Sequence, residues 1–136
     1  MPEESTTPDV VELTRYMFEA VNRRDFDAAL ALYVPHAYWR GTVDDAEGLA
    51  AIRDLWVGYF SAFEELHVIL DDVADIGNGV ILVDSRHVGR LAGGATLAEE
   101  RAFVWEFVDG RVVKTTDYVS LADARAAAER LAEERG

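Results

Sequence analysis

The chain has 136 residues, a formal net charge of −13 and no cysteine, and half of its residues are apolar. This length and apolar content predict one folded domain with a buried core. The negative charge argues against nucleic acid and anionic membranes as partners, and without cysteine the chain has no disulfide, thiolate metal site or cysteine nucleophile.

The first seven residues are polar and acidic, and we expect residues 1–7 to be disordered or loosely ordered. They lack the basic segment and apolar run of a secretory signal, so the expected location is cytoplasmic. The folded domain is expected to cover residues 8–120, and residues 121–136 are expected to form a C-terminal surface helix that frays at its end.

The first helix is predicted to begin with Thr7 as a hydroxyl cap and Pro8 at the first helical position. Its apolar stripe is Val10, Leu13, Met17 and Val21. Asp25 is predicted to cap a second short helix that reaches Tyr33 and is ended by Pro35.

Residues 37–40 are a short aromatic run that predicts a strand, and an acidic loop follows it. Apolar positions from Leu49 to Phe63 match a helical stripe, which predicts a third helix. Asp44 and Glu47 resemble a capping pair ahead of that helix.

From Leu66 onward the apolar period changes to that of strands, which are predicted over residues 66–76, 80–91, 96–108 and 111–119. The order is helix, helix, strand, helix and four strands, with the C-terminal helix last. It favours an α+β fold in which a curved antiparallel sheet carries helices on one face.

The turn at residues 109–110 allows two registers for the last hairpin. A two-residue loop pairs Val108 with Arg111, whereas a three-residue loop with a bulge at Gly110 pairs Phe107 with Arg111. The bulged register is favoured because it separates two sets of side chains. One face then carries Phe103, Trp105, Phe107, Val113 and Asp117, and the other carries Glu106, Lys114 and Thr116.

Two segments carry a resemblance to a known family. Residues 18–30 read Phe-Glu-Ala-Val-Asn-Arg-Arg-Asp-Phe-Asp-Ala-Ala-Leu, and residues 104–113 read Val-Trp-Glu-Phe-Val-Asp-Gly-Arg-Val-Val. They resemble the opening signature and the penultimate hairpin of SnoaL-like domains, which belong to the nuclear transport factor 2-like superfamily with the ketosteroid isomerase-like and limonene epoxide hydrolase-like proteins. The resemblance implies a cystatin-like cone in which the sheet wraps around the long third helix and leaves a pocket. It also implies a homodimer.

Asp117 is the first candidate for a catalytic residue, because the favoured register places it among aromatic side chains. Desolvation there would raise its pKa and suit it to proton transfer. Alternatively, it pairs with a nearby arginine or caps a loop. Residues 116–118, Thr-Asp-Tyr, resemble the Asp-Tyr of the limonene epoxide hydrolase branch, whose aspartate belongs to a water-activating Asp-Arg-Asp set.

Asp84 and Arg86 lie two residues apart on a predicted strand and therefore share a face. Facing the pocket, they would form a carboxylate–guanidinium–carboxylate network with Asp117 that orients a water or a substrate oxygen. Facing outward, they would form a surface charge ladder, and Ser85 and His87 would point inward. His87 is then the alternative general base.

An apolar cavity needs an apolar lining, and the candidates are Trp39, Trp56, Tyr59, Phe60 and Trp105, which could equally be ordinary core. His36 and His67 lack the spacing of a metal site, so no metal is predicted. The chain also lacks phosphate-binding glycine motifs, and no cofactor is predicted.

Two functions fit these observations. One is a cofactor-independent acid–base enzyme, an isomerase, cyclase or hydrolase, that acts on a small apolar molecule. The other is a non-catalytic domain that binds a small molecule or dimerises. Ala102 and Val104, on the outer side of the sheet in the favoured register, are expected to join an apolar dimer face.

Overall fold

The structure is a computed structural model that describes residues 9–42 and 44–136. The predicted helix start at Thr7 and Pro8, and the expected disorder of residues 1–7, lie outside this part of the chain. The elements in chain order are α1 (Val10–Asn22), α2 (Phe26–Leu30), β1 (Tyr33–Arg40), β2 (Asp45–Glu47), α3 (Leu49–Ser61), β3 (Phe63–Gly77), β4 (Val80–Leu91), β5 (Thr96–Val108), β6 (Arg111–Tyr118) and α4 (Leu121–Arg135).

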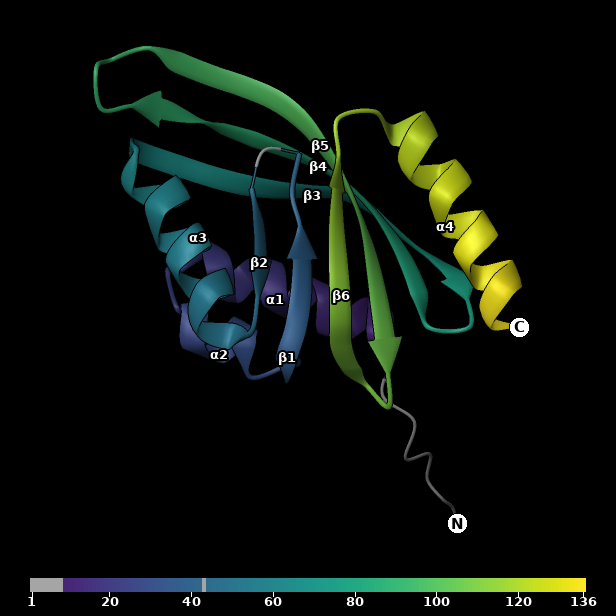
Figure 1. Cartoon of the computed structure of the whole chain (residues 1–136). Helices are drawn as coiled ribbons and strands as arrows, with labels where there is room; N and C mark the ends of the chain where they lie inside the picture. Colours follow the sequence, from purple (N-terminus) through teal and green to yellow (C-terminus); the bar gives the residue numbers. More distant parts are fainter. Residues whose placement is uncertain (1–8, 43) are drawn as a thin grey trace.

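A curved, six-stranded sheet organises the molecule, with the strand order β2-β1-β6-β5-β4-β3 (Figure 1). Helices α1, α2 and α3 lie on its concave side, and α4 lies on the opposite side. The predicted α+β cone is confirmed, although β1 and β6 run parallel to each other and the other pairs are antiparallel. No helix in the described residues is long and apolar enough to cross a membrane.

The first two helices begin at aspartates. Asp9 accepts hydrogen bonds from two backbone N–H groups at the start of α1, and Asp25 caps α2 as predicted. The prediction that α2 reaches Tyr33 is wrong, because Tyr33 begins β1. Pro35, expected to end the helix, lies within β1 where the pairing with β6 is irregular, so its missing N–H breaks no regular ladder.

A short strand replaces the acidic loop expected before the third helix. Glu47 pairs with Tyr38 across β1 and β2, so the predicted capping pair of Asp44 and Glu47 does not form. Gly48 precedes α3 instead, with a φ of 89° and no side-chain cap. This left-handed conformation suits glycine and lets the chain turn sharply from β2 into α3. Phe63, expected on the helix, begins β3.

The last hairpin combines features of both registers considered for it. Val108 pairs with Arg111, so the loop has two residues and the favoured three-residue loop is wrong. Asp109 and Gly110 both have positive φ, as a type I′ turn requires. The bulge lies further along β6, at Val113.

The bulge at Val113 resets the pairing for the rest of β6. Trp105 then lies opposite Thr115, and Phe103 lies opposite Asp117. Asp117 therefore shares a face with the aromatic side chains, as predicted. Val113 does not join this face in the regular ladder, because it is the extra residue of the bulge.

Helix α4 covers the outer face of the sheet. Ala102 and Val104 are only 2% and 0% exposed, and they pack with Ala124, Ala128 and other side chains of this cluster. The prediction that Ala102 and Val104 form an open dimer face is therefore wrong. The expected fraying of the helix is also not seen, since Arg135 donates a 2.7 Å hydrogen bond to the carbonyl oxygen of Phe107.

Side chains at the end of α1 and just after it bind the free edge of β3, the last strand of the sheet. The Asn22 amide donates to the carbonyl oxygen of Val68 at 2.9 Å and accepts from its N–H at 2.8 Å. Arg24 donates to the carbonyl oxygen of Leu66 at 2.8 Å. These bonds cover part of an edge that would otherwise offer unpaired backbone groups.

Replacing Asn22 tests this edge contact. Asn22→Ala leaves two backbone groups of Val68 without these partners, and we expect it to lower the free energy of unfolding by about 1–2 kcal/mol. Urea denaturation followed by circular dichroism measures the loss. The matched control is Glu19→Ala, an exposed position of the same helix. Equal stability of the two variants would contradict this account.

Candidate functional site

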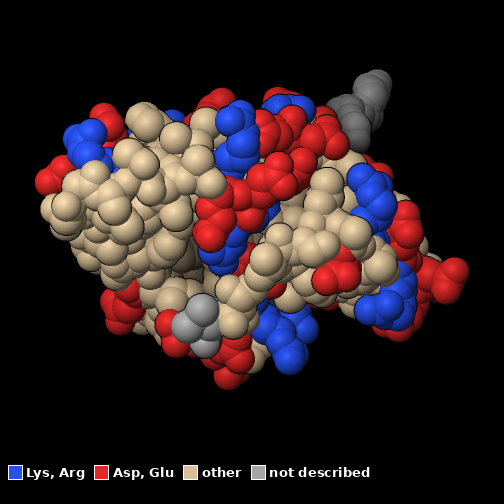
Figure 2. Space-filling view, turned by 90° about the horizontal axis from the view of Figure 1, so that it is seen from above, with Lys and Arg blue, Asp and Glu red and all other residues tan. Residues whose placement is uncertain are grey.

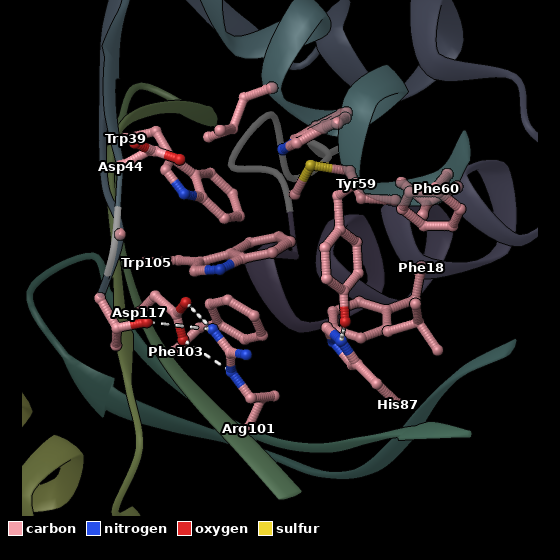
Figure 3. A pocket seen from close by; sticks show the side chains of 17 residues that line it. Phe18, Trp39, Asp44, Tyr59, Phe60, His87, Arg101, Phe103, Trp105 and Asp117 are labelled. Atoms are coloured by element: carbon pink, nitrogen blue, oxygen red, sulfur yellow. Dashed lines mark hydrogen bonds and ion pairs between the residues drawn. The ribbon is translucent and has the colours of Figure 1, made fainter. Parts of the chain in front are cut away.

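A partly open cavity of about 240 Å³ lies between the concave face of the sheet and helices α1 and α3 (Figure 3). Its wall is mostly apolar and aromatic, which suits a small apolar molecule. The apolar and aromatic lining consists of Met17, Phe18, Val21, Trp39, Leu55, Trp56, Tyr59, Phe60, Val68, Phe103 and Trp105. The charged and polar lining consists of Thr42, Asp44, His87, Arg101 and Asp117.

His87 projects from β4 into the cavity and meets Tyr59 from α3. The Tyr59 hydroxyl and Nδ1 of His87 are 2.7 Å apart, and the tautomer of the ring decides which of them donates (Figure 3). The imidazole lies between the rings of Tyr59 and Phe103, with centroids 5.5 and 6.3 Å away. Among the described residues, Nε2 of His87 has no hydrogen-bond partner, so it is free for a ligand.

Burial, with a smaller contribution from the positive charge of Arg101, lowers the pKa of His87 to about 4. His87 is only 7% exposed. Its ring is therefore neutral at pH 7. Burial raises the pKa of Tyr59, so the hydroxyl of Tyr59 keeps its proton at the same pH.

Asp117 on β6 forms an ion pair with Arg101 on β5. Arg101 donates through Nε to Oδ1 at 3.2 Å and through Nη2 to Oδ2 (Figure 3). It also donates to Glu99 at 3.0 Å and to Thr42 at 3.4 Å. Burial raises the pKa of Asp117, which is 9% exposed, and the charge and hydrogen bonds of Arg101 oppose that rise.

The predicted network of Asp84, Arg86 and Asp117 does not form. Arg86 lies on the outer face of the sheet and binds both carboxylate oxygens of Asp71, at 2.8 and 2.9 Å. Asp84 also projects away from the cavity, and burial and neighbouring carboxylates raise its pKa. The structure has the other orientation of β4 that the sequence left open, in which Asp84 and Arg86 point outward. Ser85 is buried and His87 lies in the cavity.

Several lining residues were not predicted from the sequence. The most important is Arg101, which supplies the guanidinium beside Asp117 that was expected from Arg86. Alternation along β5 gives the signal that could have identified it, since Arg101, Phe103 and Trp105 must share a face. All five aromatic side chains proposed as lining, Trp39, Trp56, Tyr59, Phe60 and Trp105, contact the cavity.

A model of the SnoaL-like domain family matches residues 14–115, about three quarters of the chain. This chain belongs to the SnoaL-like domain family. A search of curated proteins found no significant match.

Solved structures share the fold of this SnoaL-like domain. A nuclear transport factor 2-like protein of unknown function from Burkholderia pseudomallei has a TM-score of 0.75 and 20% identity, over 84% of this chain and 92% of that one. A putative SnoaL-like polyketide cyclase from Jannaschia has a TM-score of 0.75 and 16% identity, over 95% and 98%. A ketosteroid isomerase-like protein from Catenulispora acidiphila, in complex with trimethylamine, has a TM-score of 0.69 and 17% identity, over 90% and 94%. Such low identities establish the fold alone.

The charged residues of this SnoaL-like domain are mostly at its surface. The face seen in Figure 2 carries acidic and basic side chains interspersed beside a broad uncharged area. Arg101 is the cationic residue of the cavity wall in the described part of the chain, and it faces carboxylates on two sides. The cavity wall is thus mostly apolar, and the charge of Arg101 within it is paired with carboxylates.

The pKa of His87 predicts a pH dependence of stability. The ring titrates near pH 6.5 when unfolded and near 4 when folded, so the unfolded state binds the proton more readily. This contribution to stability is fully present above pH 6.5 and is lost as the pH falls to 4, by about 3 kcal/mol in all. His87→Gln should therefore flatten the fall of stability between pH 7 and 4.5 in urea denaturation. His67→Gln, at an exposed position, should leave the fall unchanged.

Proposed function

We propose that this protein binds a small, mostly apolar molecule in the cavity and transforms it by acid–base chemistry without a cofactor, as an isomerase, cyclase or hydrolase. One observation carries the proposal. A neutral imidazole, His87, lies in an apolar cavity with Nδ1 at Tyr59 and Nε2 free. General acid–base catalysis needs a group of this kind within reach of the substrate.

His87 is the proposed general base. At neutral pH its ring is unprotonated. In the tautomer whose Nδ1–H donates to the Tyr59 hydroxyl oxygen, Nε2 carries the free electron pair and can accept a proton from the substrate. Tyr59 holds the ring in place through the 2.7 Å hydrogen bond. The low pKa of His87 makes the ring a weak base, which restricts it to substrates with an activated C–H or O–H bond.

Asp117 has a supporting role in this proposal. Because both of its oxygens are engaged by Arg101, it is less free to take a proton from a substrate than an unpaired carboxylate would be. The ion pair orients both side chains at the cavity wall and sets the positive charge that depresses the pKa of His87. We assign no chemistry to Asp84 and Arg86, since both lie on the other face of the sheet.

The structural neighbours support a small-molecule function at the level of the fold. They include a putative polyketide cyclase, a putative hydroxylase from Streptomyces galilaeus, and a protein crystallised with polyporic acid. The neighbour from Catenulispora acidiphila holds trimethylamine. Different ligands in one fold mean that the occupant must be inferred from the cavity of this chain.

A binding protein without catalysis is the second candidate. The observation that favours it is the pairing of Arg101 with Asp117, which engages the buried carboxylate of the wall and leaves proton transfer to His87 and Tyr59, which are hydrogen-bonded to each other. Such a protein would still discriminate between ligands by the shape of its aromatic wall. The two candidates differ in turnover, not in binding.

The test begins with a thermal-shift screen of small aromatic and alicyclic compounds, because a ligand that binds the folded state raises Tm. Compounds that bind are then followed by mass spectrometry for conversion. His87→Gln should lower kcat about 100- to 10,000-fold while Tm and ligand binding are retained. His67→Gln is the control at an exposed histidine. Full activity of His87→Gln would refute the assignment of the base, and binding without conversion would favour the second candidate.

We also propose that the chain forms a homodimer, on the resemblance to its family alone. The face first expected to pair is covered by α4, so the proposed contact lies elsewhere on the surface. Light scattering should give twice the chain mass of 15.1 kDa. A monomer mass at working concentration would reject the dimer.

A further inference from the structure

The indole of Trp105 is fixed in the cavity wall. It projects from the concave face of β5 and is 5% exposed. The ring of Phe18 stacks on it at 5.8 Å, and the ring of Phe107 lies 6.4 Å away on the same strand face. Because neighbours hold the ring on both sides, Trp105 has little freedom to turn toward another partner.

The Nε1 atom of Trp105 is a hydrogen-bond donor without an acceptor. Among the residues that the structure describes, it is the one buried side-chain nitrogen or oxygen with no partner. Its neighbour opposite on β6 is Thr115, whose hydroxyl is already shared with Tyr33 at 3.3 Å, and its neighbour on β4 is the apolar Ile81. A buried N–H left unpaired costs about 1–3 kcal/mol.

The nitrogen edge of the indole lies on the side of the ring that faces Asp117 and Arg101 (Figure 3). This is the polar end of the cavity wall. The carboxylate oxygens of Asp117 accept from Arg101, and neither of them accepts a hydrogen bond from the indole. An indole N–H can only donate, and it therefore needs a group that accepts.

We propose that the ligand carries an acceptor oxygen, a carbonyl or ether on an apolar frame, that takes the hydrogen bond of Trp105 Nε1. The inference rests on the proposed small-molecule function and specifies the ligand of that same cavity. Nε1 itself is buried, so the oxygen of the ligand reaches it through small shifts of the side chains beside Asp117. The bond then orients the ligand relative to His87.

Two probes of nearly equal shape test this contact. Acetophenone has a carbonyl oxygen where α-methylstyrene has a CH₂ group, so only the ketone can accept from Trp105. The measurement is the ratio of the two Kd values by calorimetry or thermal shift, in the wild type and in Trp105→Phe. Because the ratio is compared between proteins, the different hydration of the two probes cancels. The variant should lose about 2- to 12-fold of the relative affinity for the ketone.

The control is Trp39→Phe, which removes the same atoms from the same cavity at an indole whose nitrogen is not a buried unpartnered atom. It should leave the ratio unchanged. A second variant carries benzothienylalanine at position 105, in which sulfur replaces the N–H and the shape of the ring is kept. This variant should fold like the wild type and lose the same relative affinity.

The outcomes separate the two proposals. An unchanged ratio in both position-105 variants, with both probes bound by the wild type, would overturn the assignment to Trp105 and leave the proposed function standing. Failure of both probes to raise the Tm of the wild type would count against the apolar ligand itself and remove the basis of both proposals. A ratio that falls in the Trp39→Phe variant as well would also overturn the specific role of Trp105.

Discussion

Alternation of side chains along β4 and β5 is the constraint on which the site depends. Successive residues of a strand point to opposite faces, so the concave face receives every second residue. On β5 these are Arg101, Phe103 and Trp105, and on β4 they include Ser85 and His87. The bulge at residue 113 sets the register in which Asp117 lies opposite Phe103 on the concave face. A shift of β6 by one residue would turn the carboxylate of Asp117 out of the cavity.

Burial of charge imposes the second condition. A carboxylate in an aromatic wall is costly without a partner, and the ion pair of Asp117 with Arg101 offsets part of that cost. The same guanidinium contributes to the low pKa of His87, because a second positive charge nearby is disfavoured. The ion pair and the neutral imidazole are therefore both consequences of one apolar environment. Replacing Arg101 would alter the partner of Asp117 and the pKa of His87 together.

Much of this fold could be predicted from the sequence, because its strands and long helices have regular apolar periods and its turns contain glycine. The element types and the strand limits from residue 80 onward agree with the structure closely. Short elements were harder to predict. Tyr33 fits the apolar face of a helix as well as that of a strand, and its place in β1 depends on pairing with Val112, about 80 residues away. A long-range contact of that kind leaves no local signal.

The inward face of β4 could not be predicted for a specific reason. Residues 80–83 are Val-Ile-Leu-Val, apolar on both faces, because α4 buries the outer side while α1 and α3 enclose the inner side. With no polar face in that stretch, the sequence left two parities open for Asp84, Arg86 and His87. The role of Arg101 was missed for a related reason, since the arginine expected beside the aspartate was sought on β4 rather than on β5.

The unsatisfied groups of the cavity connect its stability to its specificity. The unpaired Nε1 of Trp105 costs free energy that a ligand with a matching acceptor recovers, and the free Nε2 of His87 offers that ligand a second polar contact. A ligand without an acceptor leaves Nε1 buried and unpaired. Discrimination of this kind, about 1–3 kcal/mol for one unpaired group, adds to what an apolar wall achieves by shape, where one methylene contributes about 1–3 kcal/mol. The few polar atoms of this cavity are therefore the features that select its ligand.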